Sequence, residues 1–163
     1  MSEQLQQTSS YRVVQTGVTE TGLSTITQDG VVPVDTVPGG WGLGRLWEAD
    51  GVLPGTDAAP PENDAAKPPA EAGPPFPPVG GVRFWTVTVP PEAAGAPAPE
   101  FLHTPTLDVG LVLSGQIVLE MEDGTAAELS AGQAFAQQST PHRWRNPHPV
   151  DAVIAVVMLG RDQ

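Results

Sequence analysis

The chain of 163 residues contains no cysteine and a single lysine, Lys67. Without cysteine there can be no disulfide, no thiolate ligand and no thiol nucleophile, so any bound metal must be held by His and carboxylate side chains. Nineteen acidic residues stand against seven basic ones, which gives a net charge of −12. Nucleic-acid binding requires a basic surface, and an acidic protein is repelled by an anionic membrane. The composition therefore argues against both partners.

Long apolar runs are also missing. No stretch approaches the roughly 20 apolar residues that a membrane helix requires, and the N-terminus, MSEQLQQTSS, lacks the basic and apolar regions of a signal peptide. We therefore expect a cytoplasmic protein. No segment shows a convincing helical period. Apolar residues make up 39% of the chain, which suffices for the core of one domain.

Composition divides the chain into four regions. Residues 1–10 are polar, and we expect a flexible tail there. Residues 11–53 contain short β-rich runs separated by Gly, Asp and Pro, which predicts N-terminal strands that pack on a barrel. Residues 54–81 are rich in Pro and Ala, and because proline lacks a backbone donor this region is predicted to be an extended loop. Residues 82–163 are predicted to form the barrel.

The last region shows the period of two that is typical of strands. In GVRFWTVTV, Arg83 and Trp85 fall on one face together with two valines. Further strands are predicted at 107–113, 116–122, 126–129, 133–138, 142–146 and 151–159. The Ser-Gly pair at 114–115 and the Asp-Gly pair at 123–124 are typical of tight turns between strands. The pattern predicts an all-β jelly-roll barrel.

Two stretches bounded by glycine each carry one histidine. The first, GAPAPEFLHTPTLDVGLVLSG (95–115), contains His103, and the second, GQAFAQQSTPHRWRN (132–146), contains His142. Their spacing resembles the two motifs of the cupin family, G-x5-H-x-H-x4-E-x6-G and G-x5-P-x-G-x2-H-x3-N. Phe101 stands where the first His would be, and Asp108 stands where the Glu would be. In the second motif Gln137 and a serine replace Pro and Gly, and one residue is missing.

Other runs, such as YRVVQTGVTETG and GRLWEADGV, resemble small single-domain cupins of secondary metabolism. The resemblance implies a cupin double-stranded β-helix, which is a jelly-roll barrel, with extra N-terminal strands and an inserted Pro-rich loop. It also implies a homodimer, because small cupins commonly pair through their outer sheet. The ligand it implies is a small molecule.

Alternation places His142 with Trp144 on one strand and Phe135 with Gln137 on the strand before it. The resemblance implies that both faces point into the barrel. The predicted pocket is then aromatic and apolar with few polar groups, as small-molecule sites usually are. The residues predicted to bind substrate are Trp144, Gln137, Phe101, Phe135 and Trp85.

The candidate catalytic residues are His103, His142 and Asp108. An imidazole titrates near neutral pH and can accept or deliver a proton, and Asp108 could fix its tautomer. Cupins with incomplete metal sets include dehydratases, epimerases and cyclases. The resemblance therefore implies a lyase or isomerase that acts on an oxygenated, polyketide-like or aromatic molecule.

The same three side chains make up the ligand set of many non-haem iron sites, and zinc, manganese or nickel can use it as well. Because Phe101 replaces one ligand of the family set, we expect no metal or one weakly held divalent metal. A mononuclear metal-dependent dioxygenase or decarboxylase is the alternative function. A ligand-binding cupin without catalysis is the third hypothesis.

Overall fold

The computed structural model of the protein describes residues 10–51 and 75–162. Throughout these ranges the regular structure is β-strand, and they hold no helix that could cross a membrane. The strands are β1 (Ser10–Val18), β2 (Ser24–Thr36), β3 (Gly42–Ala49), β4 (Val82–Val89), β5 (Thr106–Ser114), β6 (Gln116–Met121), β7 (Ala126–Ser130), β8 (Ala134–Gln138), β9 (His142–Arg145) and β10 (Ala152–Gly160). The all-β prediction is confirmed, and from β5 onward each predicted strand end agrees with the structure to within one residue.

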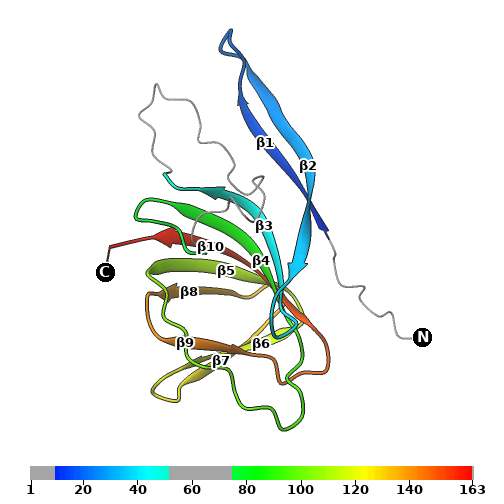
Figure 1. Ribbon diagram of the computed structural model, residues 1–163, viewed down its shortest axis with the longest axis vertical. Helices are drawn as coiled ribbons and strands as arrows, with labels where there is room; N and C mark the ends of the chain where they lie inside the picture. Colours follow the sequence, from blue (N-terminus) through cyan, green and yellow to red (C-terminus); the bar gives the residue numbers. More distant parts are fainter. Residues whose placement is uncertain (1–9, 52–74, 163) are drawn as a thin grey trace, which may run out of the picture.

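Two antiparallel sheets build the barrel. The large sheet has the order β1-β2-β3-β4-β10-β5-β8, and the small sheet has the order β7-β6-β9. Figure 1 shows the small sheet lying against one end of the large sheet, with β8 and β9 neighbouring each other. Apolar side chains from both sheets meet between them: Val89, Val112, Ala152 and Ile154 come from the large sheet, and Ile117 comes from the small one. This double-sheet arrangement is a jelly roll.

Strand register decides which side chains of the large sheet face the interior. Asp108 on β5 lies opposite Gln137 on β8 and opposite Met158 on β10, and Met158 lies opposite Arg83 on β4. Directly paired residues of an antiparallel sheet share a face, so these four side chains form one row. The next row on the same face consists of Trp85, Val156, Gly110 and Phe135.

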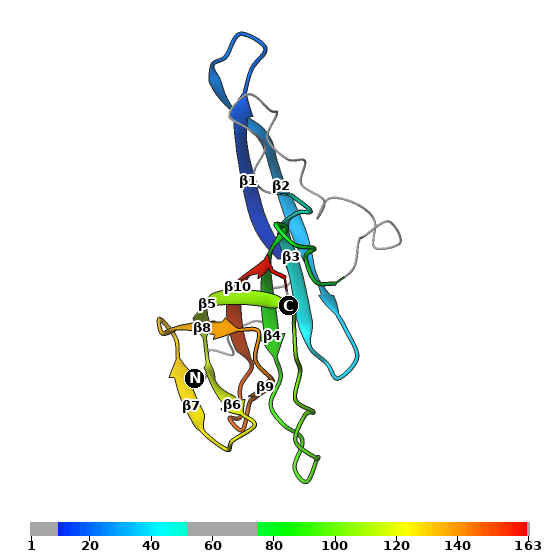
Figure 2. The same cartoon turned by 90° about the vertical axis from the view of Figure 1, so that its left-hand side faces the viewer.

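The β1–β2 hairpin stands away from the barrel, as Figures 1 and 2 both show. The sequence predicts two short runs in place of β2, divided at Asp29, but the structure has one strand of 13 residues. Backbone pairing with β1 continues through this point, where Val14 lies opposite Asp29, and the Asp29 carboxylate accepts two hydrogen bonds from Arg12 at 2.8 and 2.7 Å. Only Val34, Asp35 and Thr36 at the end of β2 pair with β3.

The predicted tail and the predicted Pro-rich loop fall mostly outside the described residues. Ser10, which we assigned to the tail, is the first residue of β1. Of the predicted loop, residues 75–81 are described, and there Gly81 donates a backbone hydrogen bond to Pro78 at 2.8 Å. The backbone amide of Gly80 donates to Gly160 at 3.1 Å, so this part of the segment lies against the end of β10.

The outward face of the large sheet carries exposed apolar side chains on its three adjacent strands β4, β10 and β5. Phe84 and Leu159 are each 36% exposed, and Val109 and Leu111 are about as open, at 40% and 41%. Cross-strand pairing places Phe84, Val157 and Val109 in one outward row. Thr86 and Thr88 on the same face of β4 are only 2% exposed, so the part of this face near β3 is covered.

Candidate functional site

Asp108 and Gln137 form the polar end of the barrel interior. They lie directly opposite each other on β5 and β8, and their side chains are 7% and 3% exposed. The amide nitrogen of Gln137 donates to the carbonyl of Thr140 at 2.7 Å and contacts the Thr140 hydroxyl at 3.0 Å. Asp108 Oδ1 and Gln137 Oε1 are buried, and no described residue offers them a hydrogen bond.

His142 completes this end from the small sheet. Its ring is 4% exposed, and Nδ1 lies 2.8 Å from the carbonyl oxygen of Thr140. A carbonyl can only accept, so Nδ1 carries a proton and the neutral ring keeps its lone pair on Nε2. Nε2 has no hydrogen-bond partner among the described residues. We expected Asp108 to fix the tautomer; in the structure the backbone of Thr140 does so instead.

The turn between β8 and β9 holds these groups in place. Ser139 has a positive φ of 48°, a left-handed conformation that is uncommon for a residue other than glycine. Its backbone amide and its hydroxyl both donate to the carbonyl of Thr106, at 3.0 and 2.8 Å. Ser139 therefore ties the turn to β5, and the next residue, Thr140, directs its carbonyl at both Gln137 and His142.

Aromatic rings close the interior below the polar end. Phe135 and Trp144 meet edge to face with their ring centroids 4.8 Å apart, and the His142 ring lies 6.4 Å from that of Trp144. Phe135 fits because Gly110 lies opposite it: a Cβ at residue 110 would lie 2.3 Å from Phe135 Cζ. The predicted inward positions of Phe135, Trp144 and Gln137 are confirmed.

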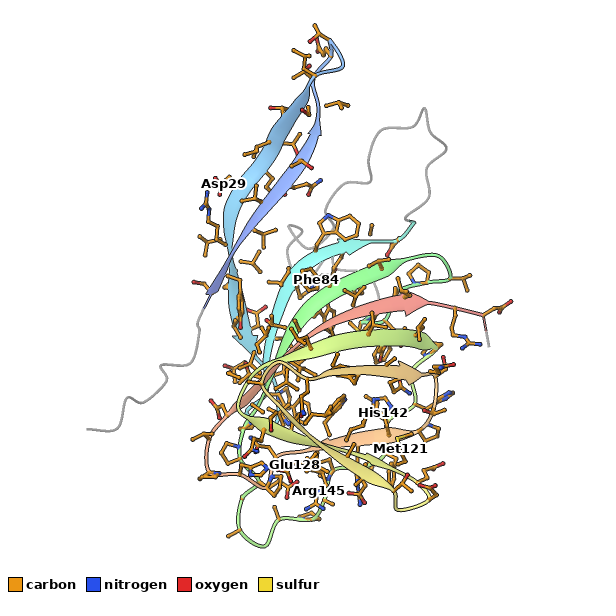
Figure 3. The ribbon with its side chains drawn as sticks, turned by 180° about the vertical axis from the view of Figure 1, so that it is seen from behind. Asp29, Phe84, Met121, Glu128, His142 and Arg145 are labelled. Atoms are coloured by element: carbon orange, nitrogen blue, oxygen red, sulfur yellow. The ribbon has the colours of Figure 1, made fainter. Side chains whose placement is uncertain are left out.

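The small sheet places Met121 next to His142. Met121 pairs with His142 across β6 and β9, so the two side chains share the inward face of the small sheet. Figure 3 shows His142 between β8 and β9, near Met121, with Arg145 on the other side of β9. A hollow of about 230 Å³ lies over β6 and β7 and is lined by Leu119, Met121, Thr125, Ala126 and Ala127, so it shares Met121 with the surroundings of His142 but is not lined by His142 itself.

The surroundings of Asp108 disfavour its ionised form. Burial raises the pKa of the Asp108 carboxyl above its usual range, while the Thr106 hydroxyl and the nearby His142 act more weakly in the opposite direction. A carboxyl group with a raised pKa retains its proton closer to neutral pH and can deliver it to a bound molecule. Asp108 is thus suited to the role of an acid.

His103 does not belong to this buried group, which corrects the prediction of two imidazoles in one pocket. Its side chain is exposed, and its Nε2 hydrogen-bonds to the carbonyl of Ser139 at 3.1 Å. Residue 103 lies in the irregular connection between β4 and β5, where the alternation of a strand does not set the side-chain direction. The backbone of Leu102, the residue before His103, forms a bridge to His142 on β9.

Phe101 is also misplaced by the prediction. Its ring is 37% exposed and stacks under the guanidinium of Arg143, 4.4 Å from the ring centroid. Arg143 alternates with His142 on β9 and therefore faces away from the interior. Phe101 thus packs on the outside of β9 and does not line the pocket.

The cupin metal set does not fit the residues present. Across residues 10–51 and 75–162, no group of three His, Cys, Asp or Glu side chains could hold a metal ion. In particular, His103, Asp108 and His142 do not converge, because the His103 ring is exposed and bonded to Ser139. We therefore derive no step of a reaction through a metal.

Trp85 faces the interior as predicted, but its polar edge is occupied. The indole nitrogen donates to Glu48 Oε1 at 2.6 Å, and Arg45 makes two hydrogen bonds to the same carboxylate. Arg83, which is 2% exposed, donates to Asp50 at 2.6 Å and has its Nε 3.9 Å from Glu48 Oε2. We call these five residues the Glu48 cluster. The sequence placed Arg83 on the inward face beside Trp85, but it gave no sign of these partners.

The comparisons with known proteins agree with this architecture. Residues 85–158 match the family model Cupin_2, described as a cupin domain. This region runs from β4 to β10 and includes Asp108, Gln137 and His142. This part of the chain is therefore a cupin domain, and its fold is the cupin jelly roll.

A curated relative is the oryzines biosynthesis cluster protein J of Aspergillus oryzae (strain ATCC 42149 / RIB 40). It is 39% identical over 49 residues, which cover 30% of this chain and 27% of the relative. The match thus spans about a quarter of that protein.

Several solved structures are similar at low identity. One is the Cupin_2 domain of an XRE family transcriptional regulator from Enterobacter cloacae, with 15% identity, a TM-score of 0.41, and coverage of 50% of this chain and 83% of that chain. Another is the DMSP lyase DddQ from Ruegeria pomeroyi DSS-3, with 19% identity, a TM-score of 0.42, and coverage of 48% and 38%.

Proposed function

We propose that this protein is a small-molecule cupin enzyme of the lyase or isomerase type, with His142 as base and Asp108 as acid. The observation that carries the proposal is the geometry of the interior. A histidine whose Nδ1 is fixed by a backbone carbonyl and a buried carboxyl group with an elevated pKa both face the barrel interior, next to the aromatic pair of Phe135 and Trp144. Paired groups with opposite proton preferences are the requirement of general acid–base catalysis.

Dehydration of a hydroxylated carbonyl compound would use these groups as follows. His142 Nε2 takes the proton from the carbon next to the carbonyl, and the electron pair of that C–H bond forms a C=C bond. The C–O bond to the hydroxyl group breaks, and the Asp108 carboxyl gives its proton to the departing oxygen. Water leaves, and the protein holds one proton more on His142 and one fewer on Asp108, so the atoms and charges balance.

The pocket is consistent with an oxygenated, polyketide-like or aromatic substrate. Phe135 and Trp144 offer aromatic surface near the polar groups, against which the apolar part of a substrate can pack. The relative from the oryzines biosynthesis cluster supports an association with secondary metabolism. The alternative hypothesis, a metal-dependent dioxygenase, lacks such support, because His103, Asp108 and His142 do not converge on one point.

A direct test incubates purified protein with a panel of β-hydroxy carbonyl compounds and uses mass spectrometry to detect loss of water. His142→Ala should reduce turnover by roughly 10²–10⁴-fold, the usual contribution of a general base. His148→Ala is the matched control, because this histidine lies in the loop after β9 and faces Glu128. Undiminished turnover in His142→Ala would contradict the proposal, and His103→Ala would then decide whether the other histidine is the base.

We also propose that the protein is a homodimer that pairs through the apolar outward face of β4, β10 and β5. Exposed apolar patches of this kind commonly mark protein interfaces. Phe84, Val109, Leu111 and Leu159 are all exposed there, although they come from the middle of a sheet. A second copy of the chain offers a face of the same composition.

A further inference from the structure

Two directly paired residues of the barrel interior, Asp108 and Gln137, each have a buried oxygen atom without a hydrogen bond. Asp108 Oδ1 and Gln137 Oε1 have no partner among the described residues, although both side chains are more than nine-tenths buried. Burying a polar atom without a partner is unfavourable, and native proteins do it rarely. Two such atoms on directly paired residues point to a ligand that supplies the missing hydrogen bonds.

The orientation of the Gln137 amide is fixed. Its nitrogen donates to the carbonyl of Thr140, and a carbonyl accepts only from the nitrogen end of an amide. Oε1 must therefore point away from Thr140. Because Asp108 is the direct cross-strand partner of Gln137, their Cβ atoms lie roughly 5 Å apart, and a small group can contact both side chains.

The chemistry of the two atoms selects the group that fits between them. Gln137 Oε1 can only accept a hydrogen bond, whereas the Asp108 carboxyl can donate when neutral and accept when ionised. A carboxylate or an ether oxygen on the ligand has no hydrogen to give to Gln137. A hydroxyl group can donate to Gln137 and accept from Asp108 at the same time.

We propose that Asp108 and Gln137 form a recognition site for a hydroxyl group of the substrate, with the attached ring or chain lying over Trp144 and Phe135. The inference rests on the proposed function, in which Asp108 protonates a departing hydroxyl group, and it adds Gln137 as the residue that selects and orients that group. The substrate class is therefore a hydroxylated ketone or a related carbonyl compound with an apolar body. In the absence of substrate, water can occupy the same place.

The test measures binding and needs no turnover. The probes are 3-hydroxycyclohexanone, cyclohexanone and 3-methoxycyclohexanone, and binding is followed through the indole N–H resonance of Trp144 in a protein NMR spectrum. The methoxy compound keeps the oxygen but cannot donate a hydrogen bond. Wild-type protein should bind the hydroxy ketone about tenfold more tightly than either of the others, the effect expected for one buried hydrogen bond.

Gln137→Met should abolish this preference, because it removes Oε1 while keeping the side-chain length. Gln116→Met is the matched control: Gln116 lies on β6, where its amide contacts Ser130, and the preference should remain. Equal binding of the three probes by wild-type protein, or a preference that survives Gln137→Met, would overturn the proposal. So would zinc binding that competes with the hydroxy ketone and is lost in Gln137→Met, because the two oxygens would then be cation ligands.

The outcomes separate this inference from the proposed function. If turnover depends on His142 but the wild-type protein does not prefer the hydroxy ketone, the enzyme assignment stands and the hydroxyl site fails. If the preference is present and depends on Gln137 but His142→Ala keeps its turnover, the recognition site stands and the acid–base scheme fails.

Discussion

His142 and Gln137 donate to the same oxygen, the backbone carbonyl of Thr140, at 2.8 and 2.7 Å. One carbonyl thus orients both the candidate base and the residue proposed to select the substrate. The carbonyl belongs to a turn that begins with the strained residue Ser139 and is tied to Thr106 on β5. The turn between β8 and β9 is therefore the element that sets the geometry of the site.

The first prediction concerns the tautomers of two histidines. His142 bonds a carbonyl through Nδ1, whereas His103 bonds the carbonyl of Ser139 through Nε2. The neutral rings should therefore carry their protons on opposite nitrogens, and nitrogen NMR of protein labelled in histidine can read this directly. His103 serves as the internal control. A proton on Nε2 of neutral His142 would contradict the proposed base.

The second prediction is that Asp108→Asn stabilises the protein near neutral pH while it removes activity. Because burial raises the pKa of the Asp108 carboxyl, the folded state disfavours the ionised form. Below the pKa that the Asp108 carboxyl has in the unfolded chain, its contribution to stability is fully present. This contribution is lost as the pH rises through the higher pKa of the carboxyl in the folded protein. Asn cannot ionise and escapes this loss.

Thermal unfolding of wild type and Asp108→Asn across a pH series provides the measurement. The variant should have the higher Tm at about pH 7, and the difference should narrow toward about pH 3, where both unfolded carboxyl and folded carboxyl are protonated. A difference that grows as the pH falls would have the wrong sign. Where turnover is measurable, the wild-type rate should decline as Asp108 loses its proton, because the ionised carboxylate cannot protonate the leaving hydroxyl group.

The sequence predicted the part of the site that lies on regular strands. Gln137 and Asp108 face inward because alternation with a period of two holds along β8 and β5. It failed for His103, since the connection between β4 and β5 is irregular and no period fixes the direction of that side chain. The role of Thr140 could not be predicted at all, because it acts through a backbone carbonyl and any residue type carries one.

The third prediction uses Gly110→Ala to test the packing of Phe135 against Trp144. A Cβ at residue 110 would lie 2.3 Å from Phe135 Cζ and 2.6 Å from the backbone oxygen of Ala155, and the backbone oxygen cannot move aside easily. We expect a loss of about 1–3 kcal/mol in the free energy of unfolding, as for other overpacked sites. Displacement of Phe135 from Trp144 should also change the near-ultraviolet circular dichroism.

Gly30→Ala is the matched control for this substitution. Gly30 also lies within a strand, but no atom lies within 4 Å of the position its Cβ would take. The control should leave both the unfolding curve and the aromatic signal unchanged. A Gly110→Ala protein with wild-type stability would show that the interior has room where the structure has none.

The fourth prediction concerns the Glu48 cluster. Glu48 is 2% exposed and accepts hydrogen bonds from Arg45 and Trp85, so Glu48→Ala leaves these partly buried donors without this acceptor. Breaking a buried ion pair by removing one partner costs about 3–5 kcal/mol, which urea unfolding would detect. Asp29→Asn breaks the exposed pair with Arg12 and should have little effect. Similar losses in both variants would show that burial does not distinguish the two pairs.

The final prediction concerns the outward apolar face. Leu111 lies near the centre of β5 and is 41% exposed, and a carboxylate placed there would be buried without a partner in a dimer formed through this face. Light scattering should show twice the chain mass for wild-type protein and a single chain mass for Leu111→Glu. Leu23→Glu is the control, because Leu23 lies in the turn of the projecting β1–β2 hairpin and is 68% exposed. A monomeric wild type would remove the proposed interface, and a dimer that tolerates Leu111→Glu would place the interface elsewhere. Neither result would affect the proposed acid–base pair, because its side chains point to the opposite face of the sheet.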